Sequence, residues 1–280
     1  MAYSNFIPSV WEESINRELE RACVFVEDCN RQYEGLVASK GDSVHILGVG
    51  KPTIKSIERA NASGEIDEAE EIDDTSVIMS INQIRYFNYK VGDIDKAQAV
   101  GGLMDALSSE TSEGLANEMD KFIANMATDS TVPTLFATPT VVTKDNVLDI
   151  LDDAIQKLQE NDVNMASGIT LTVSPRFYKL FKQAYVSKDT SNTEELKNGK
   201  VAMYAGVTIK LSNNVAKTNS GATDNIMLRT KRAIAFVNPL THTEAYRPEK
   251  SFADAVKGYA LFDGKVVRPK EIVNINVKYA

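Results

Sequence analysis

The sequence predicts an α+β fold organised around one long amphipathic helix, and three observations support this. Apolar residues recur every three or four positions from Asp93 to about Thr128. Two alternating, strand-like stretches flank an acidic segment within residues 40–92. Helices and strands then alternate until strands dominate after Ile226. A chain of 280 residues is long enough for one large domain or two moderate ones.

The helix over 93–128 is unusually long for a soluble protein. About 35 residues at ~1.5 Å each give a rod of roughly 50 Å, whereas ~11–12 residues are usual. Gly101, Gly102 and Gly114 each cost it roughly 1 kcal/mol relative to alanine, so neighbouring elements must hold it in place. Its predicted buried stripe consists of Ile94, Ala97, Val100, Met104, Leu107, Thr111, Leu115, Met119, Phe122 and Met126.

The segment before this helix predicts an arm, a short helix and a projecting hairpin. Residues 1–8 predict an extended arm, and Ser9 with Glu12 forms a capping-box start for a helix that ends near Val24. Within 40–92, strands alternate on either side of a solvated tip at 60–74, which holds seven acids. A hairpin of this length cannot bury its own apolar face, so it requires another surface, from this chain or from a second subunit.

Aromatic and aliphatic residues in the arm and the hairpin are therefore the candidates for subunit contacts. They are Phe6, Trp11, Ile54, Ile57, Val77, Met79, Ile81, Tyr86 and Tyr89.

The later part of the chain predicts an α/β block and then strands. A helix over 144–160 follows Thr143 as its cap, and Ser174-Pro175 begins another helix after a strand at Ile169–Val173. Strands follow at 207–211, 226–228, 233–237 and 259–262. Asp263-Gly264 predicts a turn into 265–267, and the last strand carries Val273, Ile275 and Val277.

Composition narrows the function classes. The net charge of −8 and the pI of about 5.0 disfavour a protein that grips nucleic acid tightly. No run approaches the ~18 apolar residues of a membrane helix, and the N-terminus lacks the pattern of a secretory signal. Cys23 and Cys29 are the only cysteines, which indicates reduced thiols in a cytosolic protein.

No catalytic motif is complete. Gly48–Thr53 lacks the first glycine and the hydroxyl residue of a phosphate-binding loop, which favours a glycine turn between strands. Ser43 in Gly41–Val44 is the candidate nucleophile of a serine hydrolase, but such a serine needs a base oriented by a third group. Only His45 and His242 are available, and neither lies in a matching pattern.

Metal and phosphate sites are not indicated either. The cysteines and histidines fit no zinc spacing, and the acids at 65–74 lack the spacing of a calcium loop. Arg229, Lys231 and Arg232 form the densest basic cluster, for which solvated surface charge is the simplest interpretation. We therefore predict no enzymatic activity, no cofactor and no metal.

Several segments resemble one known family. Phe6–Trp11, Asn30–Gly35 and Lys40–Ile46 resemble the opening of the major capsid proteins of tailed double-stranded-DNA phages, and Gly258–Pro269 is similar to their C-terminal strands. The resemblance covers most of the chain in order. It implies the tailed-phage major capsid fold, which encapsulins share.

The resemblance also implies a division of the chain. Residues 1–32 would be the N-terminal arm and helix, 33–92 the extended loop, and 93–130 the spine helix of the peripheral domain. Residues 131–228 would be the axial domain, and 229–280 the closing strands of the peripheral domain.

The implied function is a structural coat protein that assembles through pentamers and hexamers into an icosahedral shell around packaged phage DNA. It would act in the virion capsid after assembly in the host cytoplasm. Its implied partners are copies of itself, a portal, decoration proteins, weakly held double-stranded DNA and, because the arm begins near Met1, a separate scaffolding protein. An encapsulin-type compartment, a capsid decoration or binding module and the Ser43 hydrolase remain alternatives.

Overall fold

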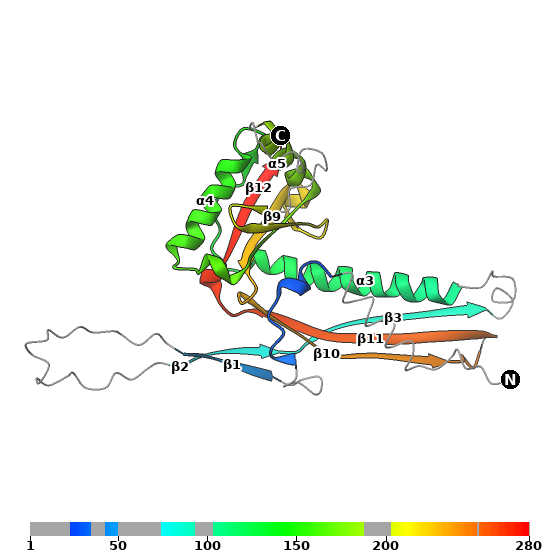
Figure 1. The fold of residues 1–280 in the computed structure, drawn as a ribbon. Helices are drawn as coiled ribbons and strands as arrows, with labels where there is room; N and C mark the ends of the chain where they lie inside the picture. The colour runs from blue at the N-terminus through cyan, green and yellow to red at the C-terminus, as the bar shows by residue number, and fades with distance from the viewer. Residues whose placement is uncertain are drawn as a thin grey trace, which may run out of the picture.

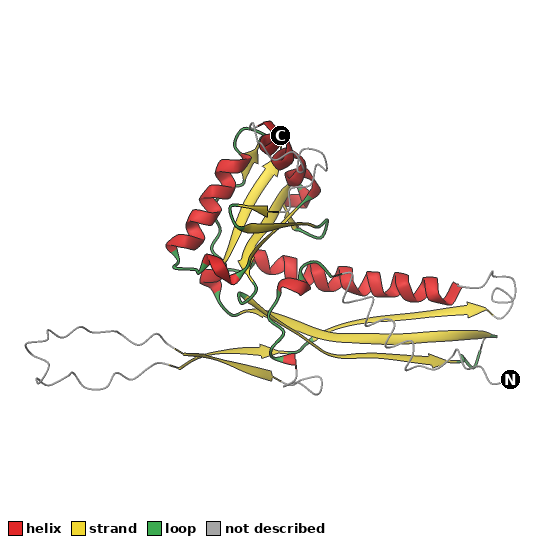
Figure 2. Ribbon diagram, viewed as in Figure 1, coloured by secondary structure: helices red, strands yellow, loops and turns green. Residues whose placement is uncertain are grey.

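The computed structural model describes residues 23–34, 43–49, 74–92, 103–187, 203–250 and 252–279. Figure 1 shows a long helix lying along a sheet of long strands, an α/β unit standing at one end of that helix, and a two-stranded ribbon that leads away from the sheet. Figure 2, coloured by secondary structure, shows helices and strands together in the α/β unit and only long strands in the layer beneath α3. The α+β fold class predicted from sequence is confirmed.

The long helix is α3, Leu103–Asn125, and the 3₁₀ turn η4, Met126–Thr128, continues it. This confirms the prediction over 103–128, while 93–102 lie outside the described residues. The buried stripe is rotated from the predicted one because α3 is covered by the sheet along one side and by the α/β unit near its C-terminal end. Leu107, Thr111, Phe122 and Met126 are only half-buried at the edge of the stripe. Its buried members are Ser108, Ser112, Leu115, Ala116, Met119, Asp120, Ile123, Ala124 and Ala127.

The sheet beneath α3 has three antiparallel strands in the order β10, Ile234–Tyr246; β11, Ala253–Val266; and β3, Gln83–Gly92. Phe262 of β11 packs edge-on against Phe122 of α3, with ring centroids 5.5 Å apart. Arg85 of β3 pairs with Glu118 of α3 at 3.6 Å. These contacts define the inner face of the sheet, which α3 covers.

The turn predicted at Asp263-Gly264 is wrong, because β11 continues through both residues, paired with Val237 and Phe236. A Cβ on Gly264 would lie 2.9 Å from Met126 Cε and 3.1 Å from Ile123 Cδ1. The glycine is therefore explained by the close approach of α3 rather than by a turn.

The base of the predicted hairpin is a ribbon of β1, Ser43–Val49, paired antiparallel with β2, Asp74–Ser80. The return stretch is not one strand, because β3 leaves the ribbon and pairs with β11 instead. Gly48 lies inside β1 opposite Thr75, so the predicted glycine turn does not begin there. Residues 50–73 lie outside the described residues.

The α/β unit contains a seven-stranded mixed sheet in the order β4-β12-β9-β5-β7-β6, with β8 also paired to β9. Its strands are β4, Thr140–Val142; β5, Ile169–Val173; β6, Met203–Tyr204; β7, Val207–Leu211; β8, Ala216–Thr218; β9, Thr223–Thr230; and β12, Ile272–Tyr279. Short 3₁₀ turns occur at η1, Val26–Asp28; η5, Met165–Ser167; η6, Asn219–Gly221; and η7, Pro269–Glu271.

The last strand does not close the three-stranded sheet. β12 lies between β9 and β4 in the seven-stranded sheet, so 272–279 pack with the block that the sequence placed at 131–228. The chain leaves the α/β unit after β9, makes the long β10–β11 hairpin and returns through η7. The two parts of the molecule therefore share interleaved stretches of chain.

Two helices cover one face of the seven-stranded sheet. α4, Val147–Glu160, buries Val147, Leu151, Ala154, Ile155 and Leu158 as predicted, together with Leu148 and Ile150. It begins after Asn146, whose side chain accepts a hydrogen bond from Thr143 N at 2.8 Å, so Thr143 is not the cap. α5, Pro175–Ser187, starts as predicted, with Phe177 N donating to Ser174 Oγ at 3.4 Å.

Candidate assembly surfaces

The described residues contain no arrangement typical of an enzyme. No group of three or more metal-ligating side chains occurs among them. Ser43 and His45 are both exposed on β1, but the structure gives no hydrogen bond between these two described side chains, and His242 lies on β10. Within the described chain, no helix is long and apolar enough to cross a membrane.

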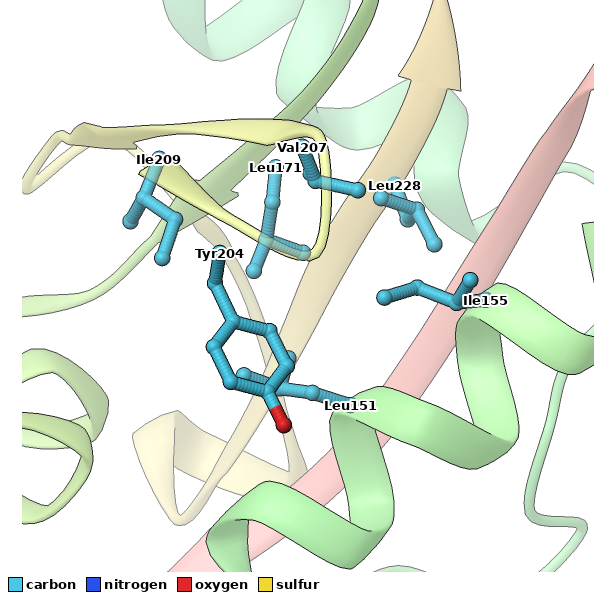
Figure 3. A pocket seen from close by; sticks show the side chains of 7 residues that line it. All are labelled: Leu151, Ile155, Leu171, Tyr204, Val207, Ile209 and Leu228. Carbon is cyan, nitrogen blue, oxygen red and sulfur yellow. The ribbon is translucent and has the colours of Figure 1, made fainter. Parts of the chain in front are cut away.

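A small cavity lies between α4 and the seven-stranded sheet (Figure 3). Its lining is apolar apart from one tyrosine hydroxyl, and its volume of about 10 Å³ has room for about one water molecule. The lining residues are Leu151, Ile155, Leu171, Tyr204, Val207, Ile209 and Leu228. With so little space and one hydroxyl, it is a packing gap rather than a ligand site.

Two of the predicted subunit-contact residues are instead part of the chain's own core. Met79 is 1% exposed and Ile81 is fully buried. They pack with Val44 and Ile46 against a patch formed by Ala235, Val237 and Leu261, and Val77 lies half-buried beside them. The prediction for Met79 and Ile81 is therefore wrong, because the sheet itself covers the apolar face of the ribbon. Phe6, Trp11, Ile54 and Ile57 lie outside the described residues.

This patch belongs to the face of the three-stranded sheet opposite α3, which we call the outer face. The ribbon covers one end of it, and the other end exposes aromatic and charged side chains. Tyr86 of β3 is 81% exposed and stands opposite Tyr259 of β11. Tyr259 in turn stands opposite His242 of β10, with ring centroids 5.9 Å apart. Tyr89 points to the other side and is half-buried beneath α3, stacked on Phe87 at 5.9 Å.

Next to Tyr86 and Tyr259 on the outer face, an ion pair, a cation–π contact and a hydrogen bond connect side chains of the three strands. Lys257 Nζ lies 3.1 Å from Glu244 Oε2 and 5.0 Å from the ring centre of Tyr246. Tyr246 donates its hydroxyl hydrogen to Asn88 Oδ1 at 3.1 Å. These contacts fix the side chains around Tyr86 and leave its ring as the most exposed aromatic side chain of the described sheet.

A buried polar cluster fastens residues 23–30 to α3 and to the α/β unit. The carboxylate of Asp120, 1% exposed, accepts hydrogen bonds from the backbone N–H groups of Val24, Phe25 and Val26 at 2.8, 3.0 and 3.3 Å. Burial raises the pKa of Asp120, and the three N–H groups offset part of that rise. Residues 24–26 are thus attached to α3 close to its C-terminal end.

Arg229 completes the cluster from the side of the seven-stranded sheet. Its side chain is fully buried, and it donates to Phe25 O at 2.5 Å and to Cys29 Sγ at 3.1 Å. The prediction that Arg229 is a solvated surface charge is therefore wrong. A run of basic residues at a strand end gives no local sign that one of them points inward, so only the fold reveals its role.

Ion pairs extend the same connection to the edge of the sheet. Lys210 of β7 lies 2.6 Å from Glu27 and 2.9 Å from the buried Asp28, and Lys231 lies 3.8 Å from Asp28. Burial alone would lower the pKa of Lys210, but the hydrogen bonds and opposite charges of Asp28 and Glu27 outweigh it, so the pKa is raised overall. Neither Cys23 nor Cys29 forms a disulfide, and burial raises the pKa of Cys29. The cluster is thus a structural connection between the two parts of the molecule.

The fold is similar to capsid structures over nearly its whole length. A structure from Mycobacterium phage Che8 is 28% identical in sequence, with a TM-score of 0.76, and the match covers 90% of each chain. The capsid structure of the cyanophage P-SCSP1u gives a TM-score of 0.72 at 16% identity and covers 92% of this chain and 88% of that one. A virus-like particle from Pyrococcus furiosus gives 0.61 at 13% identity, over 95% and 98%.

Sequence comparison alone is less informative. No protein-family model matches the sequence, and no curated protein matches it.

Proposed function

We propose that this chain, which has the tailed-phage major capsid fold, is a coat protein that assembles through pentamers and hexamers into an icosahedral shell around packaged phage DNA. The observation that carries the proposal is the likeness to phage capsid structures across about nine-tenths of both chains. Its role is structural, without enzymatic activity.

The proposed mechanism of assembly is geometric. Met79 and Ile81 lie on the apolar side of the ribbon, which packs on the outer face of the chain's own sheet. This packing anchors the base of the extended loop. Residues 50–73 follow from that base and would lie over the spine helix of an adjacent copy. The N-terminal arm, which precedes the attachment at Asp120, would clasp another.

Exposed apolar side chains on the ribbon and on the uncovered end of the outer face would add to these contacts. Ile78 on the outside of the ribbon is 52% exposed, and Tyr86 on the outer face is 81% exposed. Burying each in a neighbour would contribute on the order of 1–2 kcal/mol. Many such weak contacts give a stable shell in which each single contact can still be corrected. Val77 and Tyr89 are half-buried, so only their exposed atoms are candidates for contact with a neighbouring copy. Four residues of the arm and the loop also remain candidates for such contacts: Phe6, Trp11, Ile54 and Ile57.

The proposal extends to the partners. A separate scaffolding protein, a portal and decoration proteins would act with the shell, assembly would occur in the host cytoplasm, and the mature protein would be in the virion. The net charge of −8 suits a container that must hold double-stranded DNA only by weak contacts.

A deletion of 60–74 tests the role of the loop. Residues 60–73 lie outside the described residues, and Asp74 is the first residue of β2, paired with Val49 at the open end of the ribbon. The variant should therefore give nearly the far-UV circular dichroism of the wild type. It should fail to form large particles in sedimentation velocity under conditions where the wild type assembles. Point substitution of exposed Lys217, on β8, is the matched control and should assemble normally. Normal particles from the deletion variant would remove the loop from the assembly mechanism.

A further inference from the structure

The two helices of the α/β unit carry exposed faces of opposite charge. The outward side of α4 and its N-terminal approach is acidic, with only Lys144 and Lys157 as bases. Its exposed acids are Asp145, Asp149, Asp152, Asp153 and Glu160. Glu160 pairs with Lys157 at 3.5 Å, and Asp152 accepts a hydrogen bond from Tyr204 at 3.0 Å. Asp145, Asp149 and Asp153 have no ion pair with another described residue.

The outward side of α5 is basic. Arg176, Lys179 and Lys182 are exposed at three-residue spacing, and the helix contains no acid. Arg176 lies over the ring of Tyr279 at 5.9 Å, which leaves its charge at the surface. Neither Lys179 nor Lys182 has an ion pair with another described residue. The basic face is thus available for an external acidic surface.

The two helices lie side by side on one face of the seven-stranded sheet, where Tyr204 packs against Phe181 of α5 and donates a hydrogen bond to Asp152 of α4. In Figure 1, α4 runs along one flank of the α/β unit and α5 lies at its far end beside the C-terminus. One copy therefore offers an acidic surface and, beside it, a basic surface. Surfaces that are complementary but different make head-to-tail contacts, which close into a ring when the rotation between copies permits.

We propose that the acidic face of α4 in one copy docks against the basic face of α5 in the next copy and so orients copies around a ring. The inference rests on the proposed function, since it names the contact that would form the pentamers and hexamers. Exposed ion pairs are individually weak, but charge complementarity excludes wrong registers and accelerates encounter. Because the charges are exposed, the contact weakens with salt, as the Debye length falls from about 10 Å at 0.1 M to about 3 Å at 1 M.

Charge reversal and charge swap test the contact. Asp149→Lys with Asp153→Lys makes both faces basic, and Lys179→Glu with Lys182→Glu makes both acidic. Each double variant alone should require at least about tenfold more protein for assembly than the wild type, measured by sedimentation velocity at about 0.1 M salt. The quadruple variant, which exchanges the charges, should recover assembly, and a mixture of the two double variants should assemble better than either alone. Lys217→Glu, a reversal on β8, is the control and should behave as the wild type.

The outcomes separate this inference from the proposed function. Wild-type shells together with unimpaired assembly of both double variants would overturn the docking contact and leave the coat-protein proposal standing. Impaired double variants with no recovery in the quadruple variant would also overturn it, provided that circular dichroism shows all variants folded. Assembly that ends at dimers would replace the head-to-tail arrangement by a two-fold one. A wild type that stays monomeric under every condition would overturn both proposals.

Discussion

Replacing Asp120 by alanine should be among the most damaging single substitutions in the described chain. The carboxylate accepts three backbone N–H groups at 2.8–3.3 Å in a site that is 1% exposed. Hydrogen bonds to a charged group contribute about 1.5–3 kcal/mol each, and buried donors left without a partner add a penalty. Removing a buried charge recovers part of its desolvation cost. We therefore expect a net loss of about 3–4 kcal/mol in the free energy of unfolding.

Urea unfolding followed by far-UV circular dichroism measures this loss, and amide hydrogen exchange locates it. Exchange should accelerate most at Val24, Phe25 and Val26, the residues bonded to the lost carboxylate. Asp120→Asn keeps one acceptor oxygen and should lose less stability than the alanine variant. Glu113→Ala, at an exposed position of the same helix, is the control and should change stability by less than about 0.5 kcal/mol.

A loss below about 1 kcal/mol for Asp120→Ala, or unchanged protection at Val24–Val26, would refute this reasoning. It would mean that water or the backbone replaces the carboxylate without cost. A large loss would connect stability to assembly, because the same bonds attach the chain that follows the proposed arm.

Three further predictions concern packing, titration and surface contacts. Gly264→Ala should cost about 1 kcal/mol in urea unfolding, because its Cβ would lie 2.9 Å from Met126 Cε, 3.1 Å from Ile123 Cδ1 and 3.2 Å from Ala235 O, so that the two side-chain ends must shift, whereas Gly114→Ala, with nothing within 4 Å, should gain about 0.5–1 kcal/mol. Burial and the hydrogen bond to Asp152 raise the pKa of Tyr204 to about 12, so the folded state keeps a proton that the unfolded state loses above about pH 10. Stability should thus fall between about pH 10 and 12, by roughly 1–2 kcal/mol after allowance for solvent screening, and Tyr204→Phe should lack that component when unfolding is compared at pH 9 and 11. Tyr86→Ser should leave unfolding unchanged within about 0.5 kcal/mol but reduce assembly in sedimentation velocity, and equal assembly would remove the outer face from the interface.

Elements with a strong local signal could be predicted from the sequence. The strand at Ile169–Val173 and the start of α5 after Ser174 agree with the prediction, because alternation, the serine cap and proline at the first helical position are local properties. The buried face of α4 follows from helical periodicity alone. The resemblance to phage capsid proteins, carried by short motifs in the right order, is confirmed at the level of the fold.

Features set by tertiary packing could not be predicted in this way. Asp263-Gly264 has the composition of a turn, but β11 continues through both residues, and the side-chain ends of Met126 and Ile123 lie close to Gly264. Asp120 and Arg229 look like ordinary surface charges on a helix and at a strand end, yet both are buried by segments that are 95 to 204 residues distant in sequence. Polar residues whose partners are so far away leave no periodic signal.

The candidate contact residues show the same limit. Alternation correctly indicated that Met79 and Ile81 face an apolar surface, but it could not say whether that surface belongs to this chain or to a neighbour. The structure assigns it to Ala235, Val237 and Leu261 of the same chain. Tyr86, on the exposed face of β3, stays a candidate for contact between copies.

The most direct test of the central claim is electron microscopy of the purified protein in negative stain, alone and with a co-expressed scaffold candidate. The coat-protein account predicts closed, icosahedral shells tens of nanometres across, and DNA inside shells that have been filled. Shells that contain protein cargo instead would favour an encapsulin-type compartment. Small, uniform particles under every condition would contradict the account.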